Sequence, residues 1–273
     1  MITSDCHMHT KFSHDSEAPV REMIEGALKR GLTEICFTDH YDKDYPPMED
    51  MGETTFCFEP EAYFRELQML KQEYADHIAV RIGVEIGLQP HLKEFYRNLM
   101  AQYPFDFVIG SLHLIHGKDP YYIELFEGQT DQEIYREAFR ETLHNLQIID
   151  SFDVLGHVDY AVRYGRKQAE GYSYRTYADE IDAILEKVID MGKGIELNTA
   201  GFKYGLGFCN PHPDIIRRYR ELGGEIITIG ADAHKPEHIA YDFEKVRDIL
   251  LTCGFQYYTV FEGRKPLFRK LTS

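Results

Sequence analysis

The sequence predicts an α/β protein in which parallel strands close into a barrel. Short apolar runs alternate with long amphipathic segments along the chain, and histidines and carboxylates recur where the apolar runs end. Such alternation is typical of parallel βα units. Seven or eight units in about 250 residues favour a barrel. A doubly wound open sheet is the alternative, but it more often has a Gly-rich turn after its first strand, which is absent here.

The strands are predicted from short runs rich in branched and aromatic residues. They cover residues 34–38, 79–84, 105–111, 152–156, 194–197, 225–231 and 257–261, with residues 1–6 as a weaker first candidate. Helical segments are predicted over residues 18–30, 60–74, 131–148, 174–191, 213–222 and 237–253. In the first of these, Val20, Ile24 and Ala27 share one face. Gly254 is a typical helix end. No linker or repeat interrupts the pattern, so we expect one domain over residues 1–273.

The composition excludes several classes of protein. Hydrophobic residues make up 43% and charged residues 28% of the 273 residues, which excludes a disordered or fibrous chain. The net charge of −16 disfavours a nucleic-acid partner, because phosphate binding needs clustered Lys and Arg. No run approaches the roughly 20 apolar residues of a membrane helix. The first residues do not resemble a signal peptide, so we expect a cytoplasmic protein without a membrane partner. The five Cys are scattered without a CxxC pair, which predicts reduced thiols.

Histidines mark the ends of the predicted strands. The histidines in this position are His7, His9, His40, His113, His157 and His234, and His14 is a less certain seventh. Carboxylates at the same positions are Asp5, Asp39, Glu85 and Asp232. In a parallel barrel all strands end at one rim, where the active site forms. We therefore expect these side chains to converge, although they are more than 200 positions apart in the chain.

Each of these residues alone has an ordinary explanation. A single histidine after a strand is usually a surface residue, Asp39 and Asp232 are also suitable helix N-caps, and Glu85 is also suitable as an exposed strand end. Independent accidents at so many strand ends are improbable. Imidazole and carboxylate ligands without thiolate favour Zn, Mn or Fe. The ligands outnumber those of one catalytic zinc, so more than one ion is expected, and paired ions suit phosphate-ester cleavage.

These segments resemble those of the polymerase and histidinol phosphatase (PHP) superfamily. The matching segments are DCHMHT at 5–10, TDH at 38–40, GVEIG at 83–87, SLH at 111–113, GHVDY at 156–160 and ADAH at 231–234. They run in order over nearly the whole chain. GSLH, GHVDY, ELNTAG and the chain length resemble the histidinol-phosphate phosphatase branch. The resemblance implies a distorted (β/α)7 barrel, similar to a TIM barrel, with a trinuclear metal site.

The resemblance also implies a ligand set for two to three divalent ions, Zn, Mn or Fe. One ion would be held by His7, His9, Glu85 and Asp232; a second by Glu85, His113 and His157; and a third by Asp15, His40 and His234. Glu85 would bridge the first two ions. His14, beside Asp15, is the alternative ligand for the third. A metal-bridging hydroxide would attack phosphorus. The catalytic role is assigned to Glu85, Asp232 and His234.

The expected substrate is a small phosphate ester, and the resemblance implies L-histidinol phosphate. Arg163 and Arg166 are candidate phosphate clamps, because guanidinium binds phosphate with two parallel hydrogen bonds; a solvated basic loop is the alternative. Asn198 ends its strand at the same rim and is a candidate substrate contact. Further candidates are Asp159, as the partner of a metal ligand, and Tyr121 and Tyr122, which line a pocket for a flat amine-bearing group or belong to the core.

Four other functions stay open. An amidohydrolase-like barrel also gathers His and Asp, but it would carry a Lys where Glu85 stands. A nucleic-acid phosphodiesterase of the same superfamily is opposed by the acidic charge. A protein-tyrosine phosphatase of the superfamily is harder to exclude. A barrel without catalysis is opposed by the complete set of mapped ligands. The sequence leaves the oligomeric state open.

Overall fold

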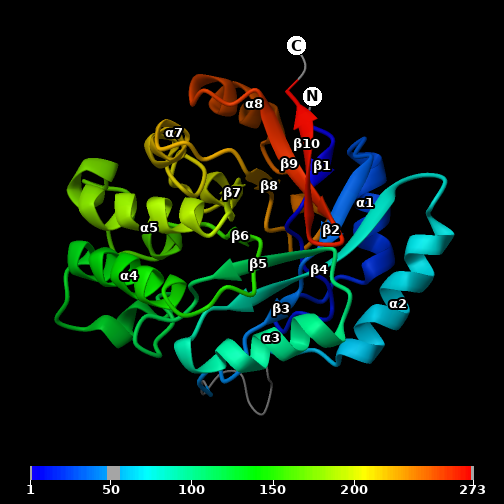
Figure 1. The fold of residues 1–273 in the computed structure, drawn as a ribbon, viewed down its shortest axis with the longest axis horizontal. Coiled ribbons are helices and arrows are strands. Elements are labelled where there is room, and N and C mark those ends of the chain that lie inside the picture. Colours follow the sequence, from blue (N-terminus) through cyan, green and yellow to red (C-terminus); the bar gives the residue numbers. More distant parts are fainter. Residues whose placement is uncertain (1, 48–55, 272–273) are drawn as a thin grey trace.

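The computed structural model describes residues 2–47 and 56–271, and its main sheet is parallel (Figure 1). The strand order is β1-β2-β4-β5-β6-β7-β8, and β3 pairs with β4 beside this path. The strands are β1 (Ser4–Asp5), β2 (Glu34–Phe37), β3 (His40–Tyr41), β4 (Ala79–Gly87), β5 (Phe107–Ser111), β6 (Val154–Leu155), β7 (Gly194–Asn198) and β8 (Ile227–Gly230). Only Met1 of the weak first candidate lies outside the described residues.

The first and last strands of this path lie side by side. The Cys6 amide donates to the Ile229 carbonyl, and the Asp232 amide donates to the His7 carbonyl, both at 2.9 Å. The sheet is therefore nearly closed, which confirms the predicted distorted barrel and shows that the open doubly wound alternative is wrong. β1 and β6 have only two residues each, so the wall is irregular at these strands.

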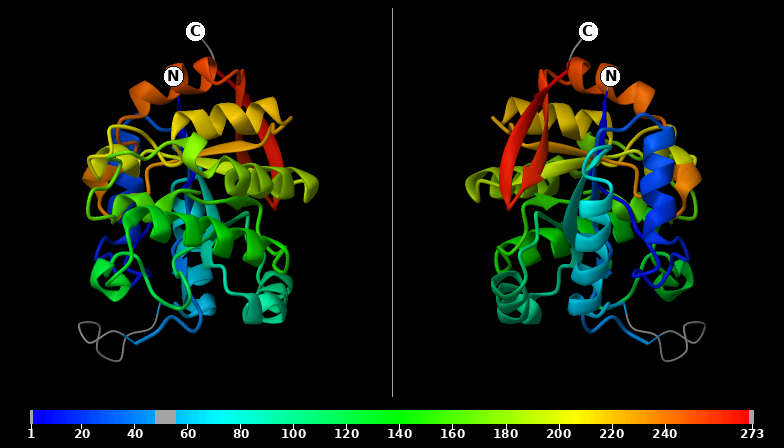
Figure 2. Two further views of the ribbon diagram at one scale, coloured as in Figure 1. Left: turned by 90° about the vertical axis from the view of Figure 1, so that its left-hand side faces the viewer. Right: turned by 90° about the vertical axis from the view of Figure 1, so that its right-hand side faces the viewer.

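Helices cover the outside of the barrel (Figures 1 and 2). They are α1 (Val20–Lys29), α2 (Pro60–Glu73), α3 (Lys93–Gln102), α4 (Asp131–Leu146), α5 (Ala178–Asp190), α6 (Ala200–Lys203), α7 (Pro213–Glu221) and α8 (Phe243–Thr252). Short 3-10 turns are η1 (Pro90–Leu92), η2 (Ile123–Phe126), η3 (Tyr160–Arg163), η4 (Tyr174–Tyr177) and η5 (Pro236–His238). Each predicted helical segment contains a helix. The segment 237–253 is interrupted before α8, where Asp242 has a left-handed φ of 55°. The helices α3 and α6 were not predicted.

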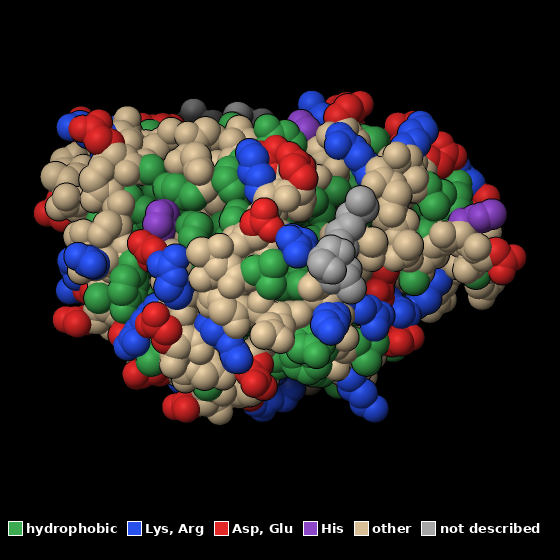
Figure 3. All heavy atoms as spheres, turned by 90° about the horizontal axis from the view of Figure 1, so that it is seen from above, with side chains coloured by type: hydrophobic (Ala, Val, Ile, Leu, Met, Phe, Trp, Pro, Cys, Tyr) green, Lys and Arg blue, Asp and Glu red, His purple; other side chains and the backbone are tan. Residues whose placement is uncertain are grey.

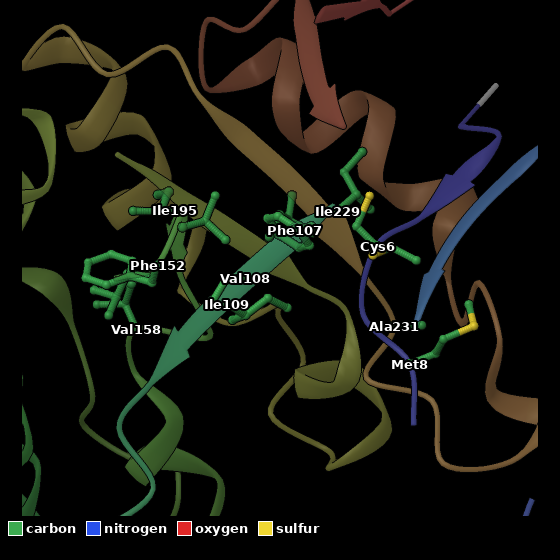
Figure 4. Packing of buried hydrophobic residues seen from close by; sticks show 14 of the residues in the cluster. Cys6, Met8, Phe107, Val108, Ile109, Phe152, Val158, Ile195, Ile229 and Ala231 are labelled. Atoms are coloured by element: carbon green, nitrogen blue, oxygen red, sulfur yellow. The ribbon is translucent and has the colours of Figure 1, made fainter. Parts of the chain in front are cut away.

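The core fills the barrel and the space beneath the helices. Phe107 and Ile109 of β5 lie close to Ile195 of β7 and Ile229 of β8 (Figure 4). Val108, between Phe107 and Ile109, points to the opposite face of β5, because successive side chains of a strand alternate between its two faces. All of these side chains are at most 1% exposed.

The last predicted strand does not belong to the barrel wall. In the ranges 2–47 and 56–271, β9 (Tyr257–Glu262) pairs only with β10 (Lys265–Lys270). The two strands are antiparallel because the chain reverses at Gly263 and Arg264, both of which have positive φ. Phe261 stacks on Phe107 at 5.0 Å between ring centroids, at the amino end of β5. The hairpin therefore covers the end of the barrel opposite the predicted site.

The face that carries this hairpin shows lysine and arginine interspersed with aspartate and glutamate (Figure 3). No single-sign stripe is visible on it. Among the described residues, no helix combines the length and apolar character that crossing a membrane requires.

Candidate metal centre

The structure brings the nine predicted ligands together at the carboxyl ends of the strands. The group comprises His7, His9, Asp15, His40, Glu85, His113, His157, Asp232 and His234, which we call the rim cluster. These side chains come from β3 and β4 and from the loops that follow β1, β5, β6 and β8. Glu85 is completely buried, and Asp15 at the outer side has a side chain that is 45% exposed.

The spacing around Glu85 suits metal ligation. Its Oε2 atom lies 3.2 Å from His7 Nε2 and 3.6 Å from His9 Nε2. Asp232 Oδ1 completes this group at 3.4 Å from His9 Nε2 and 3.7 Å from His7 Nε2. Ligand atoms that surround one tetrahedral zinc at about 2.1 Å stand about 3.4 Å apart. The four side chains therefore have the spacing of ligands to a common ion.

The other oxygen of Glu85 faces a second group. Oε1 lies 3.3 Å from His113 Nε2 and 3.0 Å from His157 Nε2. Ser111 Oγ donates a hydrogen bond to the same oxygen at 2.6 Å. One carboxylate thus contributes an oxygen to each of two groups, which is the geometry that a bridging ligand requires.

A third group lies at the more exposed side. Asp15 Oδ2 is 3.0 Å from His234 Nε2 and 3.7 Å from His40 Nε2. His14 lines the neighbouring pocket, with its ring 5.0 Å from that of Phe56. The geometry thus favours Asp15 over His14 as the third ligand of this group.

Several polar atoms of the rim cluster lack the partners that buried groups need. Among the described atoms of the rim cluster, four have no hydrogen-bond partner: His40 Nδ1, Glu85 Oε2, His157 Nδ1 and His234 Nε2. His7 Nε2 and His9 Nε2 face each other at 3.0 Å. Leaving such atoms unsatisfied costs about 1–3 kcal/mol each. Of these atoms, Glu85 Oε2 and His234 Nε2 belong to the groups described above, and bound divalent ions would satisfy their lone pairs.

Two carboxylates behind the cluster were missed by the sequence analysis. Asp42 Oδ1 lies 2.7 Å from His113 Nδ1, and Glu196 Oε1 lies 2.6 Å from His7 Nδ1. Such contacts fix the tautomer of a metal-binding histidine and direct its other nitrogen toward the ion. The sequence signal was a carboxylate inside an apolar strand, as in GIELN for Glu196.

Glycines provide the room for these two carboxylates. A Cβ atom at Gly87 would collide with the Asp42 carboxylate, and a Cβ atom at Gly230 would collide with His7 and Glu196. Asp232, two residues beyond β8, adopts a left-handed φ of 53°. Such backbone strain is concentrated at functional sites.

The cluster favours bound positive charge. Burial tends to raise the pKa of Glu85, but His7 and His113 outweigh burial and hold that pKa well below its usual range. Burial likewise opposes ionisation of Asp232, and His7 again reverses its effect. Burial opposes protonation of His113, yet Asp42 and Glu85 raise its pKa to about 10. Divalent ions supply the same positive charge when they replace these protons.

Arg163 is buried against the cluster rather than extended along the rim. Its guanidinium donates to Asp232 Oδ2 at 2.9 Å, Asn198 Oδ1 at 3.0 Å and Asn210 Oδ1 at 2.8 Å. These bonds use three of the five N–H donors of the guanidinium. Asn198 thus lies beside the cluster as expected. Lys203 lies nearby, and its Nζ is 3.3 Å from the Asp232 carbonyl oxygen.

The structure does not bring Arg166 into the site. Its guanidinium donates to the carbonyls of Gln129, Ile123 and Phe126, because the chain turns away from the rim after η3. These contacts tie Arg166 to a surface loop, and its role as a phosphate clamp stays a prediction.

Asp39, Asp5 and Asp159 serve as buried acceptors. Asp39 accepts from the Thr10 and Ser13 hydroxyls, and Asp5 accepts from the Ala231 and Ala240 amides. Asp159 accepts from Asn210 Nδ2 at 2.7 Å, so it orients the partner of Arg163.

A cavity of about 310 Å³ opens beside the cluster. Its lining residues are His14, Asp15, His40, Asp42, Tyr45, Phe56, His113, Asp119, Tyr121, Tyr122, Tyr160, Tyr164 and Tyr204. Tyr121 and Tyr122 therefore line a pocket, as one of the two alternatives predicted. The cavity is large enough for a small organic molecule whose polar end faces the cluster.

Comparison with known proteins agrees with this geometry. A model of the PHP domain matches residues 5–200. The chain belongs to the PHP domain family. A probable histidinol-phosphatase of Clostridium acetobutylicum is 32% identical over 252 residues, covering 92% of this chain and 94% of that protein. A histidinol-phosphatase of Lactococcus lactis is 30% identical and covers 96% of this chain and 95% of its own length.

Solved structures of the PHP family share the fold. The crystal structure of the Lactococcus lactis histidinol phosphate phosphatase, complexed with zinc, L-histidinol and phosphate, matches 97% of this chain and 98% of its own with a TM-score of 0.88 at 30% identity. A putative histidinol phosphatase of Listeria monocytogenes matches 89% of this chain and 99% of its own with a TM-score of 0.76 at 19% identity, which concerns the fold alone.

Proposed function

We propose that this PHP-family chain is a metal-dependent phosphomonoesterase that hydrolyses L-histidinol phosphate to L-histidinol and phosphate, a step of histidine biosynthesis. The observation that carries the proposal is the rim cluster, in which Glu85 faces two groups of histidines beside an aromatic cavity. The relative from Lactococcus lactis supports the choice of substrate, because its structure contains L-histidinol, phosphate and zinc.

The nine residues of the rim cluster would hold two to three divalent ions, Zn, Mn or Fe. The nitrogen and oxygen donors suit these metals, and no described Cys joins the groups that can hold an ion. When bound, such ions acidify a water toward hydroxide and neutralise charge on the phosphoryl oxygens.

The side chains of the chain divide the remaining tasks. Glu85 fixes the spacing of the two inner groups from a fully buried position. Asp232 and His234 lie side by side, with Asp232 Oδ1 3.7 Å from His234 Nδ1, and we assign both a catalytic role in addition to their part in holding the ions. Arg163 holds the other Asp232 oxygen and keeps two N–H donors for a phosphoryl oxygen, so we retain it as a substrate-binding residue with Asn198.

The pocket favours a small monoester over a polymer. A monoester presents a dianion to several ions, whereas a diester has one charge and a second bulky group. The net charge of −16 opposes nucleic acid. All five Cys are free, which supports a cytoplasmic location.

A substrate panel on metal-replete protein tests the function. It should contain L-histidinol phosphate, a phosphotyrosine peptide, a phosphodiester and single-stranded DNA. We expect the highest kcat/KM with L-histidinol phosphate, and loss of activity in chelator with recovery on adding Zn or Mn. Elemental analysis should find two to three ions per chain. Full activity without metal would contradict the mechanism, and equal or better diester cleavage would favour a nuclease.

A further inference from the structure

The cavity contains a buried carboxylate that the rim cluster does not use. Asp119 lies between β5 and η2 and is 8% exposed. Tyr45 donates its hydroxyl to Oδ2 at 2.6 Å, and the Tyr121 amide donates to Oδ1 at 2.7 Å. Carboxylates are almost never this buried without a cationic partner. No Lys, Arg or His in the described ranges 2–47 and 56–271 lies within ion-pair distance of Asp119.

The carboxylate retains capacity for a further donor. An ionised carboxylate offers about four lone-pair sites, and the two hydrogen bonds from Tyr45 and Tyr121 occupy two of them. The residues that surround it in the cavity are mainly aromatic: Tyr45, Phe56, Tyr121, Tyr122, Tyr160, Tyr164 and Tyr204. Aromatic faces attract ammonium groups. A carboxylate within such walls is therefore a suitable site for an organic cation.

The same cavity reaches the metal centre. Tyr160 lies 5.5 Å from the His113 ring, and Phe56 lies 6.1 Å from the His40 ring, as measured between centroids. Both histidines also line the cavity with Asp119. A molecule in the cavity can therefore place an anionic end at the rim cluster and a cationic end at Asp119.

We propose that Asp119 binds the ammonium group of an amine-bearing phosphate monoester and thereby determines specificity. This inference rests on the proposed function for the phosphate end, and it assigns the opposite end of the substrate. The alternative is that Asp119 only anchors its loop through Tyr45 and the Tyr121 amide. Asp119→Asn separates the two, because the amide keeps the size and one acceptor oxygen but loses the charge.

The direct test is calorimetric binding to metal-replete protein in the presence of phosphate. L-Histidinol and its deaminated analogue, 2-(imidazol-4-yl)ethanol, are titrated into the wild type, Asp119→Asn and the control Asp44→Asn. Asp44 is an exposed carboxylate paired with Lys43 and His91 and does not line the cavity. In Asp119→Asn we expect L-histidinol to bind about 10–100-fold more weakly, as for loss of one charge-assisted contact. Binding of the deaminated analogue should be unchanged.

Kinetics provide an independent measurement. Asp119→Asn should raise KM for L-histidinol phosphate and leave the hydrolysis of p-nitrophenyl phosphate, which has no amine, unchanged. Equal weakening of both alcohols, or of neither, would overturn the assignment, as would a wild type that does not bind L-histidinol. If the wild type hydrolyses p-nitrophenyl phosphate but not L-histidinol phosphate, the proposed function fails. Selective loss of L-histidinol affinity in Asp119→Asn would support the ammonium site even then.

Discussion

Buried polar groups occur at both ends of this barrel, but they are satisfied in different ways. At the rim, Glu85 Oε2 and three histidine nitrogens lack hydrogen-bond partners in the part of the chain that the structure describes. At the opposite end, Asp153 accepts from the Val108 amide and Arg264, and Asp106 accepts from the Ile82 and Gly263 amides. We call Asp106, Asp153 and Arg264 the base network.

This difference indicates that the rim of the barrel, and not its base, binds a ligand or ion. Single unsatisfied atoms also occur at Asp131, Asn145 and Thr228, so the gathering of four such atoms at the rim is what indicates a bound group. The base network finds its partners within the chain and holds the β9–β10 hairpin against the barrel. Changes at the rim should therefore affect activity and metal content, and changes at the base should affect stability.

The largest expected effect is that of Glu85→Gln. The amide removes the charge that faces both inner groups, so metal content should fall and kcat/KM should drop by about 1,000-fold or more. Activity assays and elemental analysis measure both effects. His14→Ala, from the wall of the cavity, is the control and should lose far less activity. Circular dichroism must first show that both variants fold, because bound metal also stabilises the native state. Equal behaviour of the two variants would refute the central role of Glu85.

Arg264→Ala should produce the opposite pattern. It leaves the Asp153 carboxylate, which is 6% exposed, without its cation. We expect a loss of about 2–3 kcal/mol in the free energy of unfolding, with kcat and metal content unchanged. Urea denaturation measures the loss. Lys265→Ala, at an exposed neighbouring position, should change stability little. A strong loss of activity in folded Arg264→Ala would contradict the view that the rim determines activity and the base determines stability.

The carboxylates behind the rim should have an intermediate effect on activity. Glu196→Gln keeps the size of the side chain but removes the charge that faces His7 Nδ1 at 2.6 Å. Such changes typically cost about 10–100-fold in metal affinity or activity. Metal titration of chelator-treated protein measures the affinity. Glu225→Gln, whose carboxylate is 72% exposed, is the control. Unchanged metal affinity in Glu196→Gln would mean that Glu196 only supports the strand.

The sequence predicted the barrel because its signal is periodic. Strands such as 194–197 and helices such as 60–74 have regular apolar patterns. The missed β10, KPLFRK, is mostly exposed and carries three positive charges, so it lacks that pattern. The missed α3 follows a 3-10 turn that begins at Pro90, and it buries only Tyr96 and Leu99. Elements that bury little apolar surface leave little trace in the sequence.

The site was predicted as far as strand ends determine it. The six histidines are found by position alone, because every parallel strand ends at the same rim. Asp42 and Glu196 were missed because only the fold shows which ring nitrogen they face. Arg163 and Arg166 are three residues apart, yet one is buried beside Asp232 and the other holds a surface loop. Side-chain direction after a strand is decided by the path of the loop, which residue spacing does not reveal.

The smallest expected effect concerns an ion pair between α5 and α7, which belongs neither to the rim cluster nor to the base network. Asp182 of α5 accepts from Arg218 Nη2 of α7 at 2.8 Å and from the Tyr174 hydroxyl at 2.7 Å. Burial tends to raise the pKa of Asp182, but the bonds from Arg218 and Tyr174 outweigh it and lower that pKa below 3.8. The folded state therefore binds the proton less well than the unfolded state does. The resulting stability is full above the unfolded pKa and is lost as pH falls through the lower folded value.

Asp182→Asn should cost about 1 kcal/mol at pH 7, because the pair is only partly exposed and is held by several bonds. The difference from wild type should persist down to about pH 4 and shrink below it, as the wild-type carboxylate takes up a proton. Urea unfolding of chelator-treated protein at several pH values measures this difference without a contribution from bound metal. Glu186→Gln, exposed on the same helix, should show no such trend. A difference that grows in acid would show that burial, and not Arg218, dominates at Asp182. In that case a carboxylate with hydrogen-bond partners would be destabilised by burial like those at the rim. A lack of hydrogen-bond partners would then no longer distinguish a binding site.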